Sequence, residues 1–136
     1  MDAPGAFCAD LAEDLKDPEF LREYVVESIR IAAVDSMVNE LDAARVSSGL
    51  SKAALARAIN MDPATMRRLF SGGASNPTLG TLAEVAAALG VEVKLEPFSE
   101  IERSQVTRPL IDGEAVDTQK LARYLATFRH PESHVL

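Results

Sequence analysis

The spacing of apolar residues predicts a mainly helical chain. Residues 19–48 contain neither Pro nor Gly, and their apolar positions recur at roughly helical intervals. Asp17-Pro18 supplies an N-cap and a proline at the first helical position, and Gly49 ends the segment. Because this run is long for a helix in a globular protein, we expect either one long helix or a break near residues 33–36.

Three shorter helices follow, and each is bounded by residues that start or stop helices. Ser51 caps the first, and Asp62-Pro63 repeats the cap-plus-proline device for the second. The first two predicted ranges are 52–59 and from 63 to 70 or 71. The third helix is expected to begin at a capping box formed by Thr81 and Glu84, or one turn earlier near Thr78, and to end at Leu89. The residues expected at their ends are Asn60, Gly72-Gly73 and Gly90.

The remaining sequence predicts one short strand and one more helix. Residues 91–95 alternate apolar and charged side chains, which is the period of a half-buried strand, and Pro97 ends it. Residues 98–113 are expected to be a linker, and residues 114–129 an amphipathic helix. The expected fold is therefore mainly α. It comprises an acidic helical extension (1–35), a five-helix domain with the short strand 91–95 (36–97), and a linker, helix and tail (98–136).

The charge of the chain is unevenly distributed. The net charge is −7, but residues 45–83 hold five basic residues and one acidic residue. Residues 1–44 hold eleven acidic and three basic residues. Because phosphate binding depends on local Lys and Arg density, the total charge does not exclude a nucleic-acid ligand.

The predicted helix 63–71 has an outward face suited to the DNA major groove. With about 100° of rotation per residue, Met66, Leu69 and Phe70 share the buried side. The opposite side and its flanks then carry Ala64, Thr65, Arg67, Arg68 and Ser71. Small residues allow close approach to the groove, and Arg can bind guanine bidentately. Alternatively, the two arginines simply solvate an exposed helix.

The start of the preceding helix offers a second contact with DNA. Ser51 and Lys52 lie at its N-terminus, where backbone N–H groups and the helix dipole favour a phosphate.

Residues 41–95 resemble the Xre/Cro family of helix-turn-helix regulators. The matching pieces are GLSKAALARAINM, DPATMRRLFSGG and NPTLGTLAEVAAALGV. The resemblance implies a double-stranded DNA operator as the ligand and a recognition helix at 63–71. The positions that it implies face DNA are Lys52, Pro63, Ala64, Thr65, Arg67 and Arg68.

The chain departs from this family at one position. The family often has an acidic residue just before the glycine that closes the recognition helix, paired with an Arg of the first helix. Here Arg45 is present, but the acidic position is occupied by Phe70. We expect packing to replace the ion pair and to leave Arg45 available for a phosphate.

The upstream segment DLAEDLKDPEFLREYVVESI resembles the N-terminus of HigA-type antitoxins. This resemblance implies a repressor of its own operon that also neutralises a toxin, bound through the N-terminal helix. The long C-terminal extension is not part of that pattern and favours an alternative, a temperate-phage or prophage repressor. A third interpretation is a protein-interaction module that grips a basic toxin without reading DNA. Its candidate contact is the apolar stripe Tyr24, Val25 and Ile29.

The family also implies a homodimer, and residues 91–95 offer a route to one. If two copies pair antiparallel about Val93, then Glu92 of each copy faces Lys94 of the other, while Val91 faces Leu95. Alternatively, the strand packs within its own monomer.

The motifs of common enzymes and metal sites are not found. The chain has no Gly-rich phosphate loop, no HExxH and no plausible nucleophile–base pair, so an enzyme is not expected. His130 and His134 are separated by Pro131, and Cys8 has no partner, so no metal or cofactor is expected. The sequence shows neither a secretory signal nor an apolar run long enough for a bilayer, which predicts a cytoplasmic protein without membrane contact.

Overall fold

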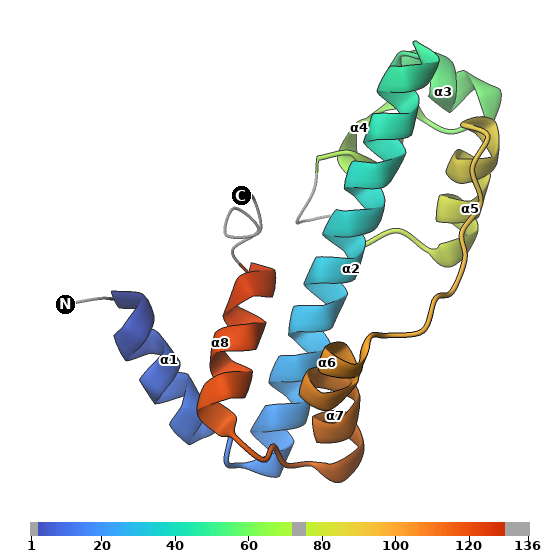
Figure 1. Ribbon diagram of the computed structural model, residues 1–136. Coiled ribbons are helices and arrows are strands. Elements are labelled where there is room, and N and C mark those ends of the chain that lie inside the picture. Colours follow the sequence, from blue (N-terminus) through green and yellow to red (C-terminus); the bar gives the residue numbers. More distant parts are fainter. Residues whose placement is uncertain (1–2, 72–75, 130–136) are drawn as a thin grey trace. The chain divides into compact units, whose positions relative to one another are not determined.

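The computed structural model describes residues 3–71 and 76–129, and these are helical apart from turns and one extended segment (Figure 1). The elements, in chain order, are α1 (Ala3–Asp14), α2 (Pro18–Ser48), α3 (Lys52–Ala58), α4 (Pro63–Leu69), α5 (Leu79–Ala88), α6 (Glu100–Glu102), the π-helical turn η1 (Arg103–Thr107), α7 (Arg108–Asp112) and α8 (Thr118–Arg129). The expectation of a mainly α fold is confirmed, whereas the predicted five-helix count is not matched. Gly72-Gly73 and the tail from His130 onward lie outside the described residues.

The chain divides into two compact units. One unit comprises Met1–Ala32 with Pro97–Leu136, and the other comprises Ala33–Glu96. Among the described helices, none has the length and apolar character needed to span a bilayer.

Of the two possibilities considered for residues 19–48, the structure has one unbroken helix, α2. The Asp17 carboxylate accepts a hydrogen bond from the backbone N–H of Phe20 at the start of the helix. At its end Gly49 adopts a left-handed conformation with φ of 71°, and the N–H of Leu50 donates to the carbonyl of Arg45. This is a glycine C-terminal cap, in which the last carbonyls gain donors that the helix itself cannot supply.

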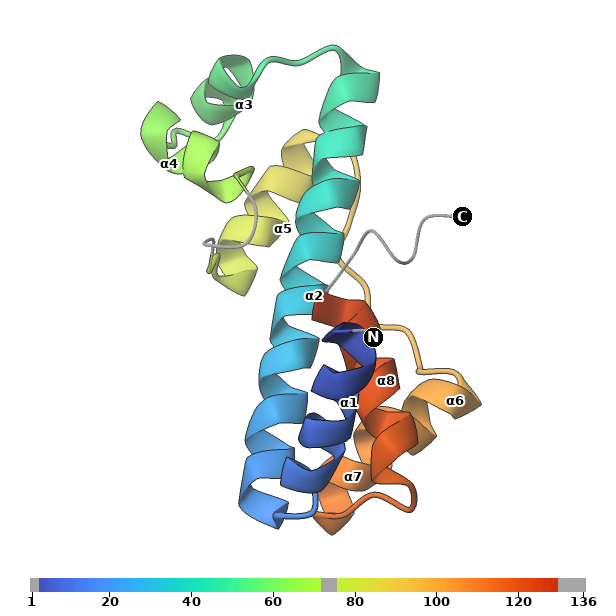
Figure 2. The same ribbon diagram turned by 90° about the vertical axis from the view of Figure 1, so that its left-hand side faces the viewer.

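The first unit is a helical cluster around a leucine-rich core. Its α1 and α8 lie side by side in both Figure 1 and Figure 2. Its fully buried aliphatic side chains include Leu15, Leu21, Val25, Leu121 and Leu125. The stripe Tyr24, Val25 and Ile29, which was considered as a grip for a partner, packs on this core instead. That expectation is wrong because α2 uses this face to bury apolar surface within its own unit.

Residues 98–113 are not a simple linker, because α6, η1 and α7 occupy most of them. Ser99 and Glu102 form a reciprocal capping box at the start, with each side chain accepting from the other residue's backbone N–H. The widened turn η1 precedes Pro109, which has no N–H to donate to the preceding helical turn. Val106 and Pro109 are buried, so this segment contributes to its unit.

The second unit packs α3, α4 and α5 against the C-terminal half of α2. Leu55, Met66 and Val85 are fully buried in its core. Ser51 caps α3 as predicted, because its hydroxyl accepts from the N–H of Ala54 at 3.0 Å. Helix α5 begins at the earlier of the two predicted starts: the Thr78 hydroxyl accepts from the N–H of Thr81 at 3.1 Å, so Thr81 is not the N-cap. Of the other residues expected at helix ends, one has the predicted geometry and one lacks the predicted hydrogen bond. Asn60 adopts a left-handed φ of 55°, while the Asp62 side chain makes no capping hydrogen bond.

The predicted strand 91–95 is not found, and no strand occurs within residues 3–71 and 76–129. The segment is extended, but a strand is defined by a ladder of hydrogen bonds to a neighbour. The N–H of Val91 donates to Ala86 at the end of α5, and residues 92–97 make no backbone hydrogen bond to another described residue. The alternating sequence therefore sets an extended conformation without a strand partner within residues 3–71 and 76–129.

At Gly113 a side chain would be disfavoured both by the backbone conformation and by a close contact. Its φ is 77°, and a Cβ at this position would lie 2.9 Å from Nη2 of Arg22. The same guanidinium donates hydrogen bonds to the carbonyls of Leu110 at 3.0 Å and Ile111 at 3.2 Å. Arg22 thereby ties α2 to the end of α7, and glycine makes room for it.

We expect Gly113→Ala to lower the free energy of unfolding of the first unit by about 1–2 kcal/mol, through left-handed strain and loss of the Arg22 contacts. Tyrosine fluorescence during urea unfolding reports on this unit, since Tyr24 and Tyr124 both belong to it. The control Gly80→Ala, whose added Cβ meets only the Thr78 hydroxyl at 3.9 Å, should leave the tyrosine transition unchanged. A Gly113→Ala variant as stable as wild type would show that Arg22 does not depend on this glycine.

Candidate nucleic-acid interface

The helix-turn-helix core determines which face of α4 is exposed. Met66 and Leu69 are buried, so α4 is fixed against the second unit along one side. Arg67 and Arg68 are exposed on the other side, while Ala64 and Thr65 are half-buried. The structure thus exposes both arginines as the helical spacing predicts, whereas Ala64, expected opposite the core, is half-buried.

The two arginines of α4 are oriented differently. Nη2 of Arg68 donates to the Thr65 hydroxyl at 3.1 Å, one turn earlier on the same helix. The hydroxyl of Ser71 donates to the carbonyl of Arg68 at 2.7 Å. Arg67 makes neither a hydrogen bond nor an ion pair with another described residue. Arg68 is therefore aligned along the helix, while Arg67 extends into solvent.

A shallow groove of about 340 Å³ joins the outward side of α4 to the start of α5. Six of its eight lining residues have polar side chains, although most of the exposed lining surface is apolar: Thr65, Arg68, Leu69, Ser71, Asn76, Pro77, Thr78 and Thr81. Asn76, Thr78 and Thr81 were not among the predicted site residues. Their position directly after the recognition helix, at an Asn-Pro turn and a helix cap, is the sequence signal that identifies them.

The start of α3 lies beside the end of α4. The hydroxyl oxygen of Ser51 accepts a hydrogen bond from the Ala54 N–H as the helix cap, which leaves its O–H able to donate to an outward ligand. Nζ of Lys52 lies 5.8 Å from the centre of the Phe70 ring. Pro63 occupies the first turn of α4 and is exposed. The predicted site residues Ser51 and Lys52 thus lie at the start of α3 and Pro63 at the start of α4, whereas Arg67 and Arg68 lie in the last turn of α4.

Arg45 is more constrained than the sequence indicates. Its guanidinium forms an ion pair with Asp42 at 2.9 Å and donates to the carbonyl of Leu50 at 2.9 Å. Its side chain is only 17% exposed, and its Cζ lies 5.8 Å from the centre of the Phe70 ring. The expectation that Arg45 is unengaged is wrong, because the turn after α2 brings an acceptor carbonyl to it. Phe70 does occupy the place of the acidic partner.

The cationic side chains at this face are not neutralised. No carboxylate lies within 4.0 Å of the amine of Lys52 or of the guanidinium of Arg67 or Arg68, within the part of the chain that the structure describes. This surface therefore presents uncompensated positive charge together with hydroxyl and amide groups, which suits a polyanion.

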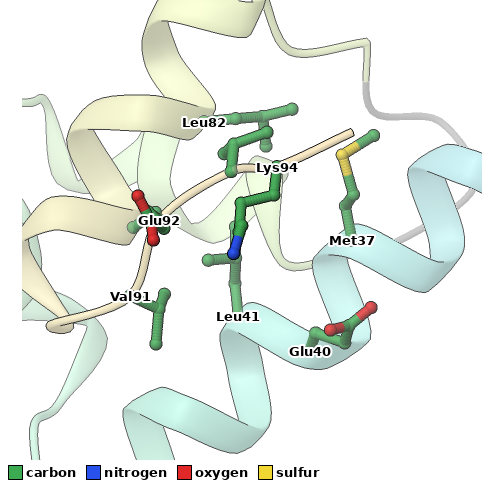
Figure 3. A pocket seen from close by; sticks show the side chains of 9 residues that line it. Met37, Glu40, Leu41, Leu82, Val91, Glu92 and Lys94 are labelled. Atoms are coloured by element: carbon green, nitrogen blue, oxygen red, sulfur yellow. The ribbon is translucent and has the colours of Figure 1, made fainter. Parts of the chain in front are cut away.

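The extended segment 91–95 borders an apolar pocket of about 210 Å³ in the second unit (Figure 3). Met37 and Leu41 of α2 form one wall, and Lys94 extends from the segment toward Leu41. Leu82 and Ala86 of α5 complete the lining. The segment is exposed throughout: Val93 is 41% exposed and Leu95 is 98% exposed.

Comparisons with known proteins agree with this geometry. Residues 41–95 match the family model described as Helix-turn-helix, and these residues include α3, α4, α5 and the end of α2. No curated protein and no solved structure matches the chain. Residues 41–95 therefore form a helix-turn-helix domain of the Xre/Cro type, which makes this chain a DNA-binding transcriptional regulator.

Proposed function

We propose that this protein is a dimeric, sequence-specific repressor that places α4 in the DNA major groove and represses its own operon, as HigA-like antitoxins do. The observation that carries the proposal is the outward face of α4. Its two arginines are exposed, lie one position apart and have no carboxylate partner among the described residues. If the two arginines only kept an exposed helix solvated, leaving their charges unpaired would bring no advantage.

In this proposal the two parts of the interface have different roles. Arg67 and Arg68 read base edges, where a bidentate Arg–guanine contact gives about 1–3 kcal/mol of discrimination. Lys52 and the polar groove at the start of α5 contact phosphates, which position the domain without reading sequence. Ala64 and Thr65 are small enough to let the backbone of α4 approach the groove.

The acidic remainder of the chain restricts how DNA can approach. The first unit carries fourteen acidic and eight basic residues, whereas residues 45–83 have a net charge of +4. Repulsion of DNA by the acidic surface lowers non-specific binding, while the positive surface retains the counterion-release term. The net negative charge of the chain thus favours selective binding to the operator over high affinity for DNA in general.

We expect Arg67→Ala/Arg68→Ala to weaken binding by about a hundred-fold or more, because two base contacts are lost. The probe is a fluorescein-labelled duplex that the wild-type protein selects from a random-sequence library, and anisotropy at fixed salt gives the affinity. The control Lys120→Ala/Arg123→Ala removes the same charge from exposed positions of the first unit and should leave the affinity within about two-fold. Equal affinity of wild type and the α4 variant would refute DNA reading by this helix.

The extended segment 91–95 supports the proposal of a dimer. Its backbone makes no hydrogen bond to the rest of the described chain over residues 92–97, and Val91, Val93 and Leu95 are exposed although apolar. Unpaired extended backbone of this kind readily adds a second strand. Antiparallel pairing about Val93 satisfies the backbone and brings Glu92 opposite Lys94 of the second copy, a cross-strand pair worth about 0.2–1 kcal/mol. A dimer also provides two recognition helices for two half-sites.

Charge reversal tests this register. Glu92→Lys and Lys94→Glu should each weaken the dimer by about two- to ten-fold or more, because each sets like charges opposite each other twice. The double variant Glu92→Lys/Lys94→Glu restores both attractive pairs and should dimerise as wild type does in sedimentation equilibrium. A Val93→Pro variant loses a ladder donor and should be monomeric. If it stays dimeric, segment 91–95 is not the interface.

One observation supports a protein partner in addition to DNA. Glu19 and Glu23 are exposed one turn apart on α2, in a unit with a clear excess of acidic residues. Such a surface favours a basic protein, as expected for an antitoxin that neutralises a toxin. The neighbouring reading frames distinguish the alternatives: a small basic toxin supports the antitoxin, and an integrase with phage genes supports the immunity repressor.

A further inference from the structure

The ring of Phe70 lies close to two cations, one from α2 and one from α3. Cζ of Arg45 and Nζ of Lys52 are each 5.8 Å from the ring centre. Phe70 directly follows α4 as its C-terminal cap residue, so its position is fixed relative to Arg67 and Arg68. One aromatic side chain therefore links the start of α3 to the end of the recognition helix.

An aromatic ring holds a cation without neutralising it. The negative face of the ring attracts ammonium and guanidinium groups within about 6 Å. A carboxylate at the same place would also attract them, but it would cancel one positive charge and compete with a phosphate for the donors. The ring thus restricts the cations while their full charge remains available to DNA.

The two cations depend on Phe70 to different extents. Arg45 is already held by the Asp42 carboxylate and the Leu50 carbonyl. Lys52 has no carboxylate within 4.0 Å among the described residues, and its amine instead lies close to the Phe70 ring. A lysine side chain loses considerable rotamer freedom when it binds, and a prior contact reduces that loss.

We propose that Phe70 is a positioning residue for DNA binding, which holds the Lys52 amine toward the phosphate backbone and keeps its charge uncompensated. This inference rests on the proposed DNA-binding function. It predicts that the charge at position 70, and not only its apolar volume, sets the salt dependence of binding.

The experiment measures affinity for the selected duplex at several salt concentrations, using wild type, Phe70→Tyr, Phe70→Leu and Phe70→Glu. Phe70→Tyr keeps the ring and should bind as wild type. Phe70→Leu loses the cation–π contact and should bind about two- to five-fold more weakly, with an unchanged salt slope. In Phe70→Glu the new carboxylate pairs with Lys52. The negative slope of log affinity against log salt should therefore become shallower by about 0.9, the contribution of one phosphate contact. Its affinity near 0.1 M salt should fall by about ten-fold.

A double-mutant cycle separates positioning from packing. If Phe70 acts through Lys52, then Phe70→Leu should cause no further loss in a Lys52→Ala background. The same penalty in both backgrounds, or a wild-type salt slope for a folded Phe70→Glu, would overturn the inference. Circular dichroism establishes folding, and the cycle decides alone if Phe70→Glu does not fold. If Arg67→Ala/Arg68→Ala also binds as wild type, the proposed function itself fails. If Arg67→Ala/Arg68→Ala binds more weakly but the Phe70 variants bind as wild type does, only this inference fails.

Discussion

The burial of Met66 and Leu69 is the constraint on which the candidate interface depends. Helix α4 has seven residues, too few to be stable as an isolated helix in water. Its structure and its orientation therefore both come from packing against the core that contains Leu55 and Val85. Once those two side chains are inside, Arg67 and Arg68 must point outward. A substitution that loosened this core would disorder the arginines without touching them.

The basic side chains of the helix-turn-helix domain fall into two groups: one is held by partners within the domain, and the others remain available to bind phosphate or bases. Arg45 is tied to Asp42 and to a backbone carbonyl, so its charge helps to fix the turn after α2. Lys52, Arg67 and Arg68 lack such partners among the described residues. Local charge of this kind is consistent with a DNA-binding surface on a chain whose total charge is −7.

Much of the fold could be predicted because its determinants are local. Ser51, Gly49 and Gly90 mark helix ends through capping and left-handed backbone geometry, and these depend on few neighbours. The exposed face of α4 follows from helical spacing alone. The capping box at Ser99 and Glu102 is also local, but the surrounding segment lacks a long apolar period, so the sequence predicts a linker there.

The features that could not be predicted depend on groups distant in sequence or absent from the chain. The contacts of Arg45 with Leu50 and Phe70 exist only after the turn and α4 have packed. The buried face of α2 in the first unit requires residues 97–129, which follow it by more than fifty positions. For residues 91–95, alternation predicts an extended backbone, whereas a strand needs a hydrogen-bonded neighbour that the described part of the chain does not supply.

The central claim is that DNA contacts the outward face of α4 and its immediate surroundings on an otherwise acidic protein. Its most direct test is an NMR titration of the isotopically labelled full chain with the selected duplex, following backbone amide shifts. The account predicts that the perturbed amides concentrate in α4, the start of α3 and the turn before α5, while α1 and α8 remain unperturbed. Perturbations concentrated in α1 and α8, or none in α4, would contradict it.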